Sequence, residues 1–86
     1  MPIISEFYGI TVRMFYNDHA PPHFHAEYGE YELIIGISPI VIMKGKAPNR
    51  VKSMVLEWTA VHQTELSENW TRCRQAQNVE KIEPLD

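Results

Sequence analysis

Three of the four histidines in this sequence lie in one short segment, residues 18–27, which reads Asp-His-Ala-Pro-Pro-His-Phe-His-Ala-Glu. In a β-strand, His23 and His25 project from the same face with Cα atoms about 6.6 Å apart, a spacing at which two imidazoles can share one metal ion. We therefore treat His19, His23 and His25 as candidate ligands of a divalent metal such as zinc, with Asp18 or Glu27 as alternative third ligands. A polar, hydrogen-bonded surface without a metal explains the same pattern.

The same segment is also suited to acid–base chemistry. Histidine titrates near neutral pH, and neighbouring carboxylates can hold a proton between them. The candidate catalytic residues are His23, His25 and Glu27, together with Arg13, which a neighbouring strand would bring beside Glu27. A simple ion pair between Arg13 and Glu27 is the alternative interpretation.

A second chemical signal is a basic turn followed by the start of a helix. Lys44, Lys46, Arg50 and Lys52 lie within nine residues of one another. Backbone N–H groups at a helix N-terminus and nearby cations attract anions, phosphate included. These four residues are therefore candidates for contact with a substrate or another anion, although charged turns are usually only solvated.

Composition limits the wider possibilities. The 86 residues suit one small domain, residues 1–86, with a thin core that a partner could stabilise. A net charge of −3 provides no general field for nucleic acid, so RNA would need a local patch. One cysteine fits a reducing compartment, and no apolar run approaches the length of a membrane span. We expect a cytoplasmic protein that does not enter membranes.

The elements that position these residues follow from hydrophobic spacing. Alternation predicts strands over 10–16 and 23–28, then a Gly29-Glu30 hairpin turn. That turn places Phe24, Ala26 and Tyr28 opposite Ile35, Leu33 and Tyr31, and Glu27 opposite Glu32. A further strand is expected over 40–44. The apolar faces of these strands should lie together, with Val12, Met14 and Tyr16 beside those of 23–28.

The second half has helical spacing. Val51, Met54, Val55, Trp58 and Val61 form an apolar stripe that should cover the sheet. A continuous helix over 49–77 would be about 43 Å long, too long for a small domain. The sequence thus predicts an α+β fold: an antiparallel sheet of three to four strands (about 10–44) on one long or two shorter C-terminal helices (about 49–77). Either the helix breaks near Gln63-Thr64, with Thr64 as the cap of a second helix, or its far end projects toward a partner.

Other side chains in the helical half are expected to be structural. Trp58 and Cys73 should be buried, whereas Trp70 is a candidate for a partner interface. His62 should be satisfied by a hydrogen bond or face a partner. Residues 78–86 should form an extended tail anchored by Ile82 and Leu85.

Several motifs resemble the family called domain of unknown function 4160, over nearly the whole chain. They are Pro-Ile-Ile-Ser-Glu-Phe-Tyr-Gly-Ile (2–10), Arg-Met-Phe-Tyr-Asn-Asp-His (13–19), Pro-Pro-His-Phe-His-Ala-Glu-Tyr (21–28), Leu-Glu-Trp (56–58), Glu-Asn-Trp (68–70) and Lys-Ile-Glu-Pro-Leu (81–85). Members of that family are small bacterial and archaeal proteins, often encoded beside a small protein of the family domain of unknown function 2442. This arrangement is similar to toxin–antitoxin operons and implies a two-component module.

Two hypotheses about function follow. The first is a component of a toxin–antitoxin-like pair, as the toxin, acting on RNA through the His/Glu/Arg cluster and docking a small co-encoded partner. The second is a non-enzymatic protein-binding module, dependent on a metal or not, whose partner is a co-encoded protein or another copy of the chain. Whether the protein is an enzyme is left open by the sequence.

Overall fold

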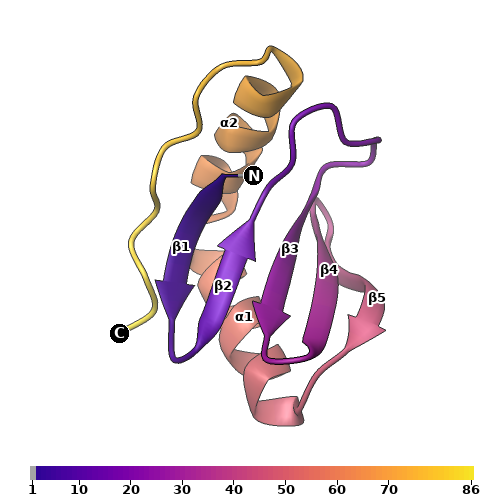
Figure 1. Ribbon diagram of the computed structural model, residues 1–86, viewed down its shortest axis with the longest axis vertical. Coiled ribbons are helices and arrows are strands. Elements are labelled where there is room, and N and C mark those ends of the chain that lie inside the picture. The colour runs from indigo at the N-terminus through magenta and orange to yellow at the C-terminus, as the bar shows by residue number, and fades with distance from the viewer. Residues whose placement is uncertain (1) are drawn as a thin grey trace.

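A computed structural model describes residues 2–86 and has an α+β fold, as the sequence predicts (Figure 1). Five strands form one antiparallel sheet in the order β1-β2-β3-β4-β5. They are β1 (Ile3–Phe7), β2 (Ile10–Arg13), β3 (His23–Tyr28), β4 (Tyr31–Ile37) and β5 (Ile40–Lys46). Two helices, α1 (Asn49–Val61) and α2 (Gln63–Arg74), lie against one face of the sheet. No helix within residues 2–86 is long and apolar enough to cross a membrane.

The β3–β4 hairpin has the register that alternation predicts. Phe24 pairs with Ile35, Ala26 with Leu33, and Tyr28 with Tyr31. Gly29 in the turn has a φ of 57°, in the left-handed region that glycine occupies without strain. The hairpin therefore presents one apolar face to the helices and carries His25, Glu27 and Glu32 on the other, which we call the outer face.

The N-terminal strands differ from the prediction, because the sheet has five strands rather than three to four. β1 was not predicted: its pairing with β2 shifts between Ile3 and Ser5, and this irregularity hides the alternation. β2 ends at Arg13 instead of reaching position 16. Asn17 has a φ of 62° in the loop that follows, and Tyr16 is 40% exposed rather than part of the apolar face. β5 is two residues longer than expected.

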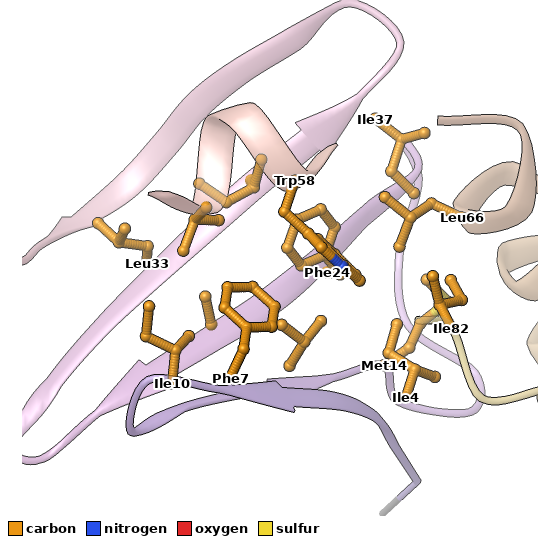
Figure 2. Close-up of a cluster of buried hydrophobic side chains, with 14 of the residues drawn as sticks. Ile4, Phe7, Ile10, Met14, Phe24, Leu33, Ile37, Trp58, Leu66 and Ile82 are labelled. Atoms are coloured by element: carbon orange, nitrogen blue, oxygen red, sulfur yellow. The ribbon is translucent and has the colours of Figure 1, made fainter. Parts of the chain in front are cut away.

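The core is centred on Trp58, which is fully buried between the sheet and the helices (Figure 2). Its ring centroid lies 5.3 Å from that of Phe7 and 5.9 Å from that of Phe24. Two predictions for the helices are wrong. Val61 is 70% exposed, because the inward position four residues after Trp58 falls on His62. Trp70 is only 8% exposed and lies within this core instead of forming a partner interface.

The helical region breaks at His62, so the version with two shorter helices is correct. Thr64 does not cap the second helix, because α2 already begins at Gln63 and His62 occupies the cap position. The helical region ends at Arg74 rather than near 77. After this point the chain returns beside β1 as an extended tail (Figure 1).

Hydrogen bonds hold the tail in place. The buried Asn69 amide donates to the Glu80 carbonyl at 2.8 Å and accepts from the Glu80 N–H at 2.9 Å. The N–H of Ile82 donates to the Ile4 carbonyl, and the indole N–H of Trp58 donates to the Glu83 carbonyl. Ile82 is buried and Leu85 packs against the core, as predicted for the tail.

Candidate functional site

Three side chains converge where the β2–β3 loop meets the start of β3. The Oδ2 atom of Asp18, in the loop, lies 2.9 Å from Nε2 of His23 and 3.3 Å from Nε2 of His25. One potential ligand atom from each of these residues lies within 4.8 Å of the other two. His23 and His25 project together because they alternate along β3, as the sequence predicts. We call Asp18, His23 and His25 the triad.

The two oxygens of the Asp18 carboxylate have different partners. Oδ1 accepts a hydrogen bond from the backbone N–H of His19 at 3.0 Å, which leaves Oδ2 for the two imidazoles. Partial burial would raise the pKa of Asp18, but the hydrogen bond from the His19 N–H and the interactions with the imidazoles of His25 and His23 outweigh it. The pKa of Asp18 is therefore lower than its ordinary value, and the carboxyl group is ionised at neutral pH.

The remaining ring nitrogens also have partners. Nδ1 of His23 lies 2.8 Å from the Pro21 carbonyl oxygen, and Nδ1 of His25 lies 3.1 Å from Oε2 of Glu32. Glu32 comes from β4. His25 pairs with Ile34, and Glu32 lies two residues before Ile34 on the same face, diagonally across from His25. Each imidazole is thus held at both nitrogens, which fixes its orientation.

Aromatic rings enclose the triad on two sides. The ring of Phe15 meets His25 edge-on at 4.5 Å between centroids, and Trp70 of α2 lies 5.2 Å from His23. His23 is consequently only 8% exposed. Phe15 of the loop and Trp70 of α2 therefore cover part of this end of β3.

A hollow of about 380 Å³ adjoins the triad and shares Asp18 with it. Its other lining residues are Asn17, His19, Ala20 and Arg74. His19 is exposed and lies in this hollow, outside the triad. Arg74, at the end of α2, was missed by sequence reasoning because only the fold brings it to the β2–β3 loop. Its guanidinium carbon lies 5.9 Å from the centre of the Trp70 ring.

The other two catalytic candidates pair with each other beside the triad. Nε of Arg13 donates to Oε1 of Glu27 at 2.9 Å. Arg13 lies directly opposite His25 across the β2–β3 pair, and Glu27 lies opposite Glu32 across the hairpin. The ion pair considered from the sequence is therefore present. The positive charge of Arg13 offsets the negative charge of Glu27, which lies opposite Glu32. Arg13 and Glu27 both lie outside the triad.

The four basic residues of the predicted anion site fall into two groups. Lys44 and Lys46 lie on β5 with exposed side chains, in rows that run across the sheet to Ile34 and Glu32. These rows place them on the outer face, the face of His25. Arg50 and Lys52 lie in the first turn of α1, which packs against the opposite face (Figure 1).

This small α+β fold, with an antiparallel five-stranded sheet and a histidine–aspartate triad at one end, can be placed in a family by comparison with known proteins. The model of the family described as domain of unknown function (DUF4160) matches residues 9–71, and the chain belongs to that family. The matched region includes the whole triad but not Arg74. No curated protein and no solved structure matches the chain.

Proposed function

We propose that this protein is the RNA-directed component, the toxin, of a toxin–antitoxin-like pair, and that an RNA phosphodiester is bound and cleaved at the triad. The observation that carries the proposal is the convergence of two imidazoles on the carboxylate of Asp18, which also lines a hollow that contains the guanidinium group of Arg74. The proposal places the protein in the cytoplasm, where RNA and a co-encoded partner would both be present.

The chemistry of phosphodiester cleavage requires activation of the attacking oxygen and positive charge near the phosphate. The triad would activate the attacking oxygen. Arg74 supplies the second, because it lines the hollow, whereas Arg13 is already paired with Glu27. An arginine fork also matches the oxygens of a phosphate. Among the residues proposed from the sequence, His23 and His25 keep a direct role, while Arg13 and Glu27 act by positioning the strand beside them.

The outer face supports a path for the rest of an RNA strand. Lys44 and Lys46 are exposed on β5, on the same face of the sheet as His25. With a net charge of −3, the chain would hold RNA through a few local contacts, and binding should depend only moderately on salt.

The proposal is tested by inducing the protein in bacterial cells and following growth and RNA integrity. Wild type should slow growth and fragment RNA, and His25→Gln should do neither. His62→Gln is a matched control, since this imidazole also contacts a carboxylate, that of Glu65, but lies at the helix junction. Equal growth and equally intact RNA with all three proteins would remove the proposal.

A second candidate function is a non-enzymatic protein-binding module. It is favoured by β5, which ends the sheet and carries Val41 and Met43 with 48% and 42% of their surfaces exposed. An edge strand with apolar side chains is suited to pairing with a strand of another protein. Co-purification with a co-encoded protein that is lost in Met43→Lys, without any effect of His25→Gln on cells, would favour this alternative.

A further inference from the structure

All the hydrogen-bond partners of the imidazoles of His23 and His25 are acceptors. A carbonyl or carboxylate oxygen only accepts, and a neutral imidazole has one N–H to donate. Four ring nitrogens face four such contacts, namely Pro21 O, Glu32 Oε2 and, from both rings, Asp18 Oδ2. Two neutral imidazoles therefore satisfy only half of these contacts.

His23 shows the mismatch most clearly. Its Nδ1 must donate, because its partner is the carbonyl oxygen of Pro21 at 2.8 Å. In the neutral ring Nε2 then carries a lone pair, and this lone pair points at the Asp18 carboxylate only 2.9 Å away. Such an arrangement is repulsive unless a proton or a cation lies between the two atoms.

His25 repeats the pattern. When Nδ1 donates to Glu32, the lone pair of Nε2 also points at Oδ2 of Asp18, at 3.3 Å. Both Nε2 atoms thus face the same carboxylate oxygen. We propose that Asp18 Oδ2, His23 Nε2 and His25 Nε2 bind one divalent transition-metal ion.

Two of the three distances between the ligand atoms fit such a site. Metal–ligand bonds of about 2.0–2.1 Å place neighbouring ligand atoms about 2.9–3.4 Å apart in octahedral or tetrahedral geometry. The two distances from Asp18 Oδ2 to the imidazole nitrogens, 2.9 and 3.3 Å, fall in this range. Two imidazoles and one carboxylate suit zinc and its first-row neighbours rather than magnesium or calcium, which prefer oxygen ligands.

The groups behind the ligands fit as well. Metal-binding histidines usually donate the other ring N–H to a carbonyl or a carboxylate, and Pro21 O and Glu32 occupy these positions. Three protein ligands leave at least one coordination position for water or substrate, as in catalytic zinc sites. Asp18, one of the three ligands, also lines the hollow.

The proposed metal site does not depend on the proposed function, but any role of the metal in RNA cleavage rests on that function. With the metal bound, His23 and His25 are ligands rather than an acid and a base, and the ion supplies Lewis-acid chemistry at the hollow. Arg74 keeps its proposed role with the phosphate.

The test is zinc binding by the purified protein without a histidine tag, measured by competition with a chromophoric chelator. Wild type should bind one equivalent. Asp18→Asn and His25→Gln should lower the affinity at least a hundredfold, and Glu32→Gln, a positioning residue, by about 10- to 100-fold. His19→Gln and His62→Gln are the matched controls and should bind zinc as wild type does.

Wild type alone keeps the inference testable if a variant fails to fold. One equivalent of Co²⁺ should give the visible absorption bands of a protein-bound ion, and zinc should abolish them. No binding above that of a protein-free blank, or loss of binding in His62→Gln but not in His25→Gln, would overturn the inference. Zinc binding with no RNA cleavage would support the metal site and contradict the proposed function; RNA cleavage by protein that binds no zinc would do the reverse.

Discussion

Nε2 of His23 lies 2.9 Å from Oδ2 of Asp18, while the opposite nitrogen of the same ring is committed to the Pro21 carbonyl. This relationship links the β2–β3 loop to β3 and determines which atom of His23 faces the carboxylate. Because His25 turns its own Nε2 to the same oxygen, the site has one centre rather than two separate ion pairs.

Arg74→Ala should weaken RNA binding without changing zinc affinity. Arg74 lines the hollow but is outside the triad, and loss of a charge-assisted hydrogen bond of about 1.5–3 kcal/mol corresponds to about 10- to 100-fold in affinity. Fluorescence anisotropy with a short labelled RNA at one fixed salt concentration measures the effect. Lys81→Ala, an exposed cation in the tail, is the control. Equal losses in the two variants would show that only net charge matters.

Asn69→Ala should destabilise the protein by about 2–4 kcal/mol, because the buried amide loses two hydrogen bonds to the Glu80 backbone and a third from the Arg72 guanidinium. Urea unfolding followed by tryptophan fluorescence gives the free energy. Asn78→Ala, at an exposed position before the tail contacts, should change it by less than about 0.5 kcal/mol. If Asn69→Ala unfolds at the same urea concentration as wild type, the tail is not held by this amide.

Gly45→Ala should be far more disruptive than Gly29→Ala. A Cβ at position 45 would lie 2.0 Å from the carbonyl oxygen of Glu32, and Gly45 has a φ of 102°, so backbone must move next to a residue that orients His25. A Cβ at position 29 meets open space, and its left-handed conformation should cost only about 1–2 kcal/mol. Thermal unfolding of both variants makes the comparison, and a melting temperature for Gly45→Ala at or above that of Gly29→Ala would contradict it.

Cys73 should make the protein less stable at alkaline pH. Burial raises the pKa of this thiol above its ordinary value of 9.0, so the folded state keeps a proton that the unfolded state releases. The stability contribution is complete below pH 9 and is lost as pH rises through the pKa of the folded state. Urea unfolding at a series of pH values, for wild type and Cys73→Ala, isolates the effect. The difference in stability between the two should shrink above pH 9; a constant difference would mean that Cys73 does not titrate differently on folding.

Local patterns predicted the elements whose residues alternate cleanly. The β3–β4 hairpin follows from Phe24, Ala26 and Tyr28 alternating with polar residues and from a glycine at the turn. β1 was not predicted, because its pairing with β2 is irregular between Ile3 and Ser5 and the alternation of its residues is broken there. Val61 was misplaced because the residues three and four positions after Trp58, Val61 and His62, can both continue an inward-facing helical stripe. In the structure the inward position falls on His62, where α1 ends, and Val61 is exposed.

The site was only half predictable for a similar reason. His23 and His25 follow from strand geometry alone, since they are two residues apart. Asp18 was one of several possible third residues, because the conformation of the loop, with Asn17 at positive φ, decides which side chain reaches Nε2. Arg74 reaches the site through tertiary packing, which local spacing does not encode. The hairpin pattern did place Glu32 opposite Glu27, but it did not show the contact of Glu32 with His25.

The central claim is tested most directly by an NMR titration, in which zinc is added to protein whose histidines carry ¹⁵N. This measurement observes the imidazole nitrogens themselves. If Asp18, His23 and His25 form one metal-binding centre, Nε2 of His23 and Nε2 of His25 should shift together and saturate at one equivalent. His19 and His62 should keep their shifts over the same range. Shifts of His19 or His62 alone, or no saturable change in His23 and His25, would contradict the account.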